Sequence, residues 1–297
     1  MKKLATVLAV VLLSSCSTEK ILQDSEYATK ADEAMKAGVY DLAIADYQKL
    51  LEEYPFSDYS EEAQLKVGQA QYQNKQYAEA IASFQDFQRM HPTNANLALT
   101  EYYTALSYMD QMGTVDRDQR AAENAQVHFQ TVIERYPESP FTAEARQRLK
   151  ECREKLALHE LDVAKFYLIW TNPLGAESRL RRLLENYPDT DVSGAALVEF
   201  GRYFRKRGDL SRSALAYASV VTQYPGNPNL AEARDSLADF KGKRIEVPQA
   251  PLPALVETLG RPTVAAAPAA PAAAPSPAPK PTDVSDAETH ANPSARN

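Results

Sequence analysis

A dipeptide of an aromatic residue followed by proline recurs along the middle of the chain, and its spacing constrains the fold more than any other feature. Tyr54, Tyr136, Tyr187 and Tyr224 each precede a proline, and His91 occupies the same place once. The five prolines follow one another at intervals of 37, 45, 51 and 37 residues. Because proline cannot continue a helix, each dipeptide marks the end of a helical segment. A period of this length predicts an array of similar units.

The residues that lead up to each proline repeat as well. The position twelve residues before the proline is small, the position eight before is large, and the position five before is apolar. In chain order these residues are Ala43, Ala80, Ala125, Ala176 and Ser213; Tyr47, Phe84, Phe129, Leu180 and Tyr217; and Leu50, Phe87, Val132, Leu183 and Val220. Offsets of four and three residues place them on one stripe of a helix, so we expect this stripe to pack against a neighbouring helix.

A second amphipathic segment precedes each of these helices, and no segment shows a sustained alternation of apolar and polar residues. The preceding segments are 26–37, 58–74, 96–112, 142–170 and 193–207. We therefore predict an all-α fold, a helical-hairpin solenoid of about five tetratricopeptide-like repeats over residues 26–244, with a closing helix at 227–241. Residues 113–119 are polar and predict a loop. No Pro or Gly interrupts Thr142 to Trp170, so we expect one unusually long helix there.

The N-terminus has the features of an export signal. A basic start is followed by the apolar run Leu4–Leu13 and two serines, which predicts a signal peptide over residues 1–15. The run is too short to span a membrane, which takes about 20 apolar residues. Leu13-Ser14-Ser15-Cys16 resembles a bacterial lipobox, in which the cysteine carries acyl chains; an ordinary signal peptide is the alternative. Ser17 in place of aspartate favours sorting to the outer membrane, with residues 16–25 as a lipidated linker.

The C-terminal composition predicts a tail. Of the 19 prolines, 11 lie after residue 244, and aromatic residues are absent from 245–297. A segment of this composition buries too little apolar surface to offset the entropy of ordering, so we predict a disordered Pro/Ala-rich tail. It is either a spacer or an uninvolved segment.

Several classes of function are disfavoured. The formal net charge is −7, which makes the chain a poor candidate for binding nucleic acid. His159-Glu160 begins like a zinc-protease motif, but Val163 stands where the second histidine ligand belongs. Cys152 lies in a helical pattern, and a buried structural role is expected for it. We predict no catalytic residues, no metal and no cofactor, and expect a non-catalytic protein whose concave face binds peptides.

Four local strings carry a family resemblance. Residues 54–60, Tyr-Pro-Phe-Ser-Asp-Tyr-Ser, resemble the exit of the first repeat in the family of outer membrane protein assembly factors BamD. Asp116-Arg117-Asp118 resembles that family's insertion, residues 160–167 resemble its Glu-x-x-Val-Ala-x-Phe/Tyr-Tyr run, and residues 179–190 resemble its Arg-x₇-Tyr-Pro-Asp-Thr segment. The resemblance covers about residues 16–240, and the insertion is shorter here than in enterobacterial members.

The resemblance implies a subunit of the machinery that inserts β-barrels into the outer membrane, anchored at its periplasmic face by lipid on Cys16. It implies that the first repeats bind the C-terminal signal segment of unfolded barrel proteins, with Tyr54, Phe56 and Tyr59 as substrate-binding candidates. It also implies docking of the C-terminal repeats on a periplasmic POTRA domain of the barrel subunit BamA. Other lipoproteins of the complex are further partners. The partner-binding candidates are Arg179, Arg182, Asp116 and Arg117.

Two alternatives remain at this stage. A tetratricopeptide lipoprotein that coordinates cell-envelope constriction, or a pilotin of a secretion or pilus system, would share the repeats but lack the long helix and the Asp116–Asp118 loop. An enzyme acting on peptidoglycan is disfavoured by the missing motifs. The sequence also predicts that Arg179→Glu leaves folding and thermal stability unchanged, because Arg179 lies one residue off the packing stripe.

Overall fold

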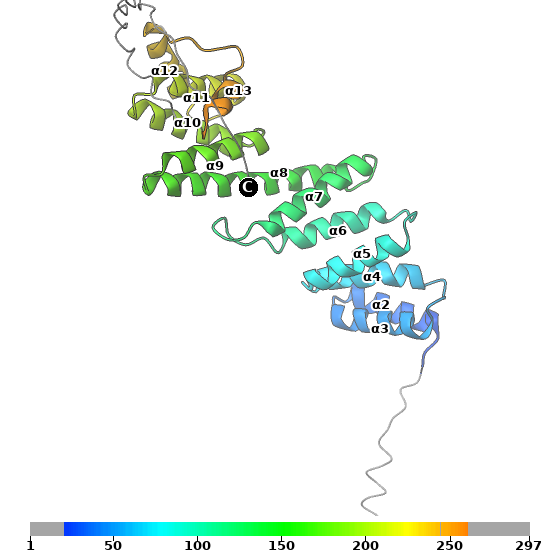
Figure 1. Cartoon of the computed structure of the whole chain (residues 1–297). Helices are drawn as coiled ribbons and strands as arrows, with labels where there is room; N and C mark the ends of the chain where they lie inside the picture. Colours follow the sequence, from blue (N-terminus) through cyan, green and yellow to red (C-terminus); the bar gives the residue numbers. More distant parts are fainter. Residues whose placement is uncertain (1–20, 244, 261–297) are drawn as a thin grey trace, which may run out of the picture. The chain divides into compact units, whose positions relative to one another are not determined.

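The structure is a computed structural model that describes residues 21–243 and 245–260 of the 297-residue chain. These residues form helices and turns, with no strand among them (Figure 1). The helices are α2 (Asp24–Lys36), α3 (Tyr40–Glu53), α4 (Ser60–Gln73), α5 (Tyr77–Met90), α6 (Leu97–Met109), α7 (Arg120–Arg135), α8 (Thr142–Ile169), α9 (Pro173–Asn186), α10 (Asp191–Lys206), α11 (Leu210–Gln223), α12 (Leu230–Gly242) and α13 (Pro251–Thr258). The chain divides after Arg261, and the second unit, 262–297, lies outside the described residues.

The predicted all-α array of five helical hairpins is confirmed. The hairpins are α2/α3, α4/α5, α6/α7, α8/α9 and α10/α11, and each helix packs against the next one along the chain. The predicted closing helix is α12, which packs on α11. The polar residues 113–119 form the connection between α6 and α7, as expected.

The repeating stripe is the core of the array. All fifteen residues at the positions five, eight and twelve before the prolines are at most 1% exposed. They lie on the second helix of each hairpin, where they face the helices before and after it in the chain. The spacing of the stripe in the sequence therefore identified the buried face of every one of these helices.

The aromatic–proline dipeptides end five helices in the same conformation. The C-cap residues Tyr54, His91, Tyr136, Tyr187 and Tyr224 have φ between −125° and −132° and ψ between 42° and 62°. This lies outside the helical region because a following proline crowds the residue before it. The carbonyl oxygens of Tyr54, Tyr136 and Tyr187 each accept a hydrogen bond of 2.7–2.8 Å from a hydroxyl six residues later, on Ser60, Thr142 and Ser193. The turn thus supplies its own partners for the helix end.

Small residues in the first helix of a hairpin allow the large residue of the second to approach closely. A Cβ built on Gly68 would lie 2.7 Å from the ring of Phe84, and one built on Gly201 would lie 3.0 Å from the ring of Tyr217. The same offset of sixteen residues pairs Ala31 with Tyr47 and Ala164 with Leu180, all of them buried. The two helices of these hairpins are therefore in contact through one small and one large side chain.

The predicted long helix is α8, 28 residues from Thr142 to Ile169. It packs against α7, α9 and α10, and so connects its own hairpin, the fourth, with the third and the fifth. Cys152, in its first half, has no exposed surface, and burial together with nearby Glu151 raises the pKa of its thiol to about 12. This agrees with the structural role expected for Cys152.

The predicted boundary of the tail at residue 245 is wrong. Residues 251–258 form α13, which packs on α11 and α9. Leu252, Leu255 and Leu259 are spaced by three and four residues, and each is at most 7% exposed in the C-terminal core. Pro251 starts the helix at a position where no backbone N–H is needed. The high proline content of the segment concealed this apolar face.

The folded region also begins earlier than residue 26. Helix α2 starts at Asp24, and Leu22 packs against the first core cluster. The Tyr54 hydroxyl donates a hydrogen bond of 2.9 Å to the carbonyl oxygen of Leu22. The linker predicted over residues 16–25 is therefore shorter than expected, and its remainder, together with Cys16 and the predicted signal peptide, lies outside the described residues.

We predict that Gly68→Ala lowers the free energy of unfolding by about 1–3 kcal/mol, because the added methyl group overlaps the buried Phe84 ring. The matched control is Gly242→Ala at the end of α12, where a Cβ meets nothing within 4 Å. Its stability should stay the same or rise by up to about 1 kcal/mol, the difference in helix propensity. Chemical denaturation followed by circular dichroism measures both, and equal stability of the two variants would contradict the close helix contact.

Candidate functional site

Three segments distant in sequence meet around a cavity of about 270 Å³. They are the end of the loop between α6 and α7 with the start of α7, the middle of α8, and α9. The lining residues are Arg117, Asp118, Gln119, Arg120, Glu123, Leu156, His159, Glu160, Arg179, Arg182 and Tyr187. Four of these eleven side chains are arginines, so we call this site the arginine cavity.

A buried carboxylate holds two of the arginines. Glu160 on α8 is only 4% exposed. Its Oε2 accepts a hydrogen bond of 3.1 Å from Nη1 of Arg179, and its Oε1 lies 2.9 Å from Nε of Arg182. Residues three apart on a helix share a face, so both guanidinium groups reach Glu160 from α9. A carboxylate tolerates such burial only when it is paired, and here both of its oxygens are.

One contact joins the loop 113–119 to α8, and hydrogen bonds within the loop fix its conformation. Nδ1 of His159 lies 2.5 Å from the carbonyl oxygen of Val115. The amide of Gln119, itself 9% exposed, donates to the carbonyl oxygens of Thr114, Val115 and Arg117 at 3.1, 3.3 and 2.8 Å. These contacts position Arg117 at the cavity.

The ion pairs of the cavity do not use all of its guanidinium donors. Arg120 pairs with Asp118 at 2.6 Å, and Arg179 and Arg182 share Glu160. In the described part of the chain no carboxylate lies within ion-pair distance of Arg117. Each guanidinium carries five N–H donors in a planar fork, more than one carboxylate oxygen can accept. The arrangement is suited to bind a further carboxylate or another anion.

The structure brings together three of the four predicted partner-binding residues. Arg179, Arg182 and Arg117 line the arginine cavity. Asp116 is an exposed neighbour in the loop that does not line it, and hydrogen bonds from the Thr114 side chain and the backbone hold the pKa of its carboxyl below the usual value. In the sequence, Glu160 was noted only in an incomplete zinc-protease motif and in a family string, and its role as anchor of the arginines was not predicted.

The structure changes the expectation about the stability of Arg179→Glu. The prediction that charge reversal leaves stability unchanged assumed a guanidinium without a partner in its own chain. Because Arg179 is paired with the buried Glu160, a glutamate at this position would place two carboxylates side by side. Neutral substitutions are therefore the informative ones.

The predicted substrate-binding residues lie in the turn between α3 and α4 and differ in accessibility. The Phe56 side chain is fully exposed, and Tyr59 is 41% exposed. Tyr59 also lines a cavity of about 110 Å³ together with Asp32, Tyr47 and Lys66. Burial favours a higher pKa for Asp32, but hydrogen bonds from Lys66 and Tyr47 hold its pKa below the usual value. Tyr54 is half-buried and bonded to Leu22, which makes it part of the scaffold.

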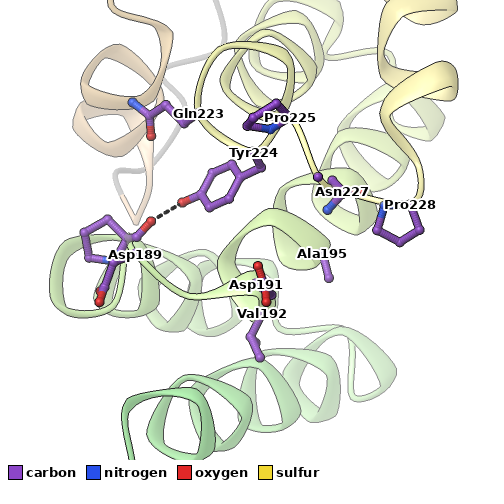
Figure 2. A pocket seen from close by; sticks show the side chains of 11 residues that line it. Asp189, Asp191, Val192, Ala195, Gln223, Tyr224, Pro225, Asn227 and Pro228 are labelled. Carbon is purple, nitrogen blue, oxygen red and sulfur yellow. Dashed lines mark hydrogen bonds between the residues drawn. The ribbon is translucent and has the colours of Figure 1, made fainter. Parts of the chain in front are cut away.

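A further cavity, of about 620 Å³, was not predicted. Figure 2 shows it between the turn that follows α9 and the turn that follows α11. The Tyr224 hydroxyl crosses from one turn to the other and donates a hydrogen bond of 2.6 Å to the carbonyl oxygen of Pro188. Asp189 at its rim is bound by Nε of Arg153 at 2.9 Å. The aromatic–proline repeat was the available signal, because two consecutive turns of this kind form the walls.

The described residues hold neither a metal-binding cluster nor a helix fit to span a membrane. No group of three or more His, Cys, Asp or Glu side chains there is arranged to hold a metal ion. No helix in the same part of the chain combines the length and the apolar character needed to cross a bilayer.

The chain is similar to several known proteins. The family model described as outer membrane lipoprotein, YfiO, matches residues 22–216. The outer membrane protein assembly factor BamD of Vibrio cholerae is 30% identical over 208 residues, which are 65% of this chain and 86% of that protein. The protein of the same name from Caulobacter vibrioides is 30% identical over 214 residues, 72% of this chain and 70% of that one. Among solved structures, the complex of the TPR2AB domain of yeast Sti1 with pHSP90 shares 15% identity, covers 79% of this chain and 95% of that chain, and has a TM-score of 0.35.

We predict that Glu160→Gln lowers the free energy of unfolding by about 1–2 kcal/mol, because it leaves two guanidinium groups without their buried carboxylate. The loss stays moderate because Arg179 and Arg182 are 32% and 52% exposed and can turn to water. Glu185→Gln is the control, since its pair with Arg181 one helical turn away lies at the surface, and it should cost less than about 0.5 kcal/mol. Denaturant titration of both variants measures the difference, and equal values would show that Glu160 is not the anchor.

Proposed function

The chain belongs to the YfiO family of outer membrane lipoproteins, and from that premise we propose how it serves outer membrane protein assembly. It is a non-catalytic subunit of the complex that inserts β-barrels into the outer membrane. Its C-terminal hairpins dock on a POTRA domain of the BamA-like barrel subunit, and its first hairpins receive unfolded barrel segments. The observation that carries this proposal is the convergence of Arg117, Arg179 and Arg182 on one cavity around a buried carboxylate.

The docking role follows from the chemistry of the arginine cavity. Glu160 fixes Arg179 and Arg182 in place before any partner arrives, so little side-chain entropy remains to be lost on binding. A planar guanidinium binds a carboxylate through two parallel hydrogen bonds, which gives direction as well as strength. The partner therefore presents an acidic side chain to this cavity. Other lipoproteins of the complex are further partners.

The substrate role rests on the turn between α3 and α4. Phe56 exposes its whole ring, which is unusual for a large apolar side chain in a folded protein. Tyr59, three residues later, borders a small cavity. A short aromatic-rich strand from an unfolded barrel protein has side chains that fit against such rings. Phe56 and Tyr59 are the contact residues in this proposal, and Tyr54 supports the turn.

The anchor completes the proposal. Lipid on Cys16 holds the protein at the periplasmic face of the outer membrane, and the signal peptide before it directs export. The lipobox string at residues 13–16 supports this assignment. More than one acyl chain gives stable anchoring, whereas a single myristoyl chain gives only reversible binding.

We predict that Arg179→Gln weakens binding of the POTRA-containing region of the barrel subunit by at least about tenfold, because a desolvated charge pair across an interface is lost. The control is Arg181→Gln, the next residue but one on α9, whose guanidinium pairs with Glu185 instead. It should change the affinity less than about twofold. Calorimetric titration with the full-length protein in detergent measures both, and circular dichroism checks the fold. Wild-type affinity of Arg179→Gln would contradict docking at the arginine cavity.

We predict that a photo-crosslinking residue at Phe56 or Tyr59 captures a peptide that ends in an aromatic β-strand signal, because both side chains reach solvent at the same turn. The control position is Val39, which is 49% exposed in the turn between α2 and α3. Mass spectrometry of the crosslinked peptides locates the contact. Equal labelling by a scrambled peptide, or equal labelling at Val39, would show non-specific adhesion.

A further inference from the structure

Four large apolar side chains gather at the tip of the α8/α9 hairpin and remain exposed. Phe166, Ile169, Trp170 and Leu174 are 54%, 77%, 69% and 47% exposed, and we call them the tip patch. The rings of Phe166 and Trp170 lie one helical turn apart with their centroids at 5.9 Å. Soluble proteins seldom leave so much contiguous apolar surface in water unless something covers it.

The tip that carries the patch is well ordered by its own hydrogen bonds. Backbone N–H groups of Trp170 and Asn172 donate to the carbonyl oxygens of Phe166 and Tyr167 at 3.2 and 2.9 Å. The Asn172 side chain accepts from the N–H of Gly175 at 3.0 Å and caps α9. Thr171 between them has a φ of 54°, a conformation that costs energy for a β-branched residue. The exposed rings are thus held in place rather than left on a loose loop.

The tip patch continues the surface of the arginine cavity. His159 lines that cavity, and Phe166 and Trp170 follow it on α8 by seven and eleven residues. These separations are close to two and three full turns, so the three side chains lie along one face of α8. On α9, Leu174 precedes Arg179 by five residues. At a rise of about 1.5 Å per residue, cavity and patch lie within about 17 Å of each other along α8.

A partner that docks at the cavity alone would make a small interface. A stable protein–protein interface covers about 800 Å² on each side, far more than a cavity of about 270 Å³ offers. Residues that contribute most to such interfaces are enriched in tryptophan, tyrosine and arginine and cluster together. The tip patch supplies an exposed tryptophan, and the neighbouring arginine cavity supplies the arginines.

The charges near the tip patch argue against a lipid surface as the occupant. Apolar patches that insert into anionic membranes are bordered by lysines and arginines. The lysine nearest in sequence, Lys165, is paired with Glu199 on α10 at 3.2 Å. The charge of this lysine is thus balanced within the chain, and the arginines of the adjacent cavity are held around the buried Glu160, an arrangement that suits an acidic protein surface.

We propose that the tip patch is the apolar half of the docking site for the barrel subunit, so that one domain covers both the arginine cavity and Trp170. This inference rests on the proposed function and adds the chemistry of the partner surface. The partner domain carries an exposed apolar patch within about 17 Å of the carboxylate that binds the arginines. Trp170 is the anchor of this half because it presents the largest exposed ring of the patch.

Trp170 is the only tryptophan in the chain, which makes it a direct probe. The full-length protein in detergent is labelled with 5-fluorotryptophan and titrated with the unlabelled POTRA-containing region of the barrel subunit. Fluorine NMR then reports one site on one protein. We expect the fluorine resonance of Trp170 to shift on binding. In a matching fluorescence experiment, we expect iodide to quench the fluorescence of Trp170 less when the partner is bound.

Affinity measurements separate the two halves of the site. Trp170→Ser should weaken binding at least about tenfold while the melting temperature stays unchanged, because the ring is exposed in the free protein. The matched control is Leu42→Ser on α3 in the first hairpin, which is 44% exposed, and it should change the affinity less than about twofold.

The outcomes are distinguishable. If the wild-type protein does not bind, the proposed docking fails and the inference fails with it. If Arg179→Gln weakens binding while Trp170→Ser binds like the wild type and the fluorine signal does not move, docking stands and the tip patch is not part of it. A shift of the signal on adding vesicles of phosphatidylethanolamine and phosphatidylglycerol, or on concentrating the protein alone, with none on adding the partner, would overturn the assignment in favour of a membrane or a second copy.

Discussion

The fixed end of every second helix is the constraint on which the array depends. A proline after an aromatic residue ends the helix in one backbone conformation, and a hydroxyl six residues later completes the turn in three of the five cases. Because the turns are alike, each new hairpin starts from an equivalent position. The small and large residues of the stripe can then pack against residues of the neighbouring helix in the same way in each hairpin. Substituting the proline would remove the common starting point on which these contacts rely.

The arginine cavity exists because two units depart from this regularity. The extra residues of the fourth repeat lengthen α8, and the extra residues before the third repeat's second helix form the loop 113–119. The longer helix carries His159 and Glu160 to the place where that loop and α9 converge. The proposed docking site is therefore built by the two insertions, whereas the regular repeats supply the scaffold. Asp118 in this loop pairs with Arg120 at the start of α7.

Local periodicity made much of the fold predictable from the sequence. The positions at twelve, eight and five residues before each proline identified fifteen buried residues, and the absence of Pro and Gly identified α8. Contacts between distant residues were not predictable in the same way: Glu160 lies nineteen residues from Arg179, and the His159 ring meets the carbonyl of Val115 across forty-four. Helix α13 was missed because average composition was given more weight than the spacing of three leucines.

The length of α8 has a mechanical consequence. Its 28 residues form a rod of about 42 Å, with Ala145 and Cys152 in one core cluster and Leu161 and Ala164 in another. A continuous helix is far stiffer along its axis than the turns that join neighbouring hairpins. A tilt of about 5° at its C-terminal end therefore displaces its N-terminal end by roughly 4 Å, about the diameter of a methyl group. A displacement of α8 at Trp170 is therefore transmitted along the helix to the core cluster that contains Cys152.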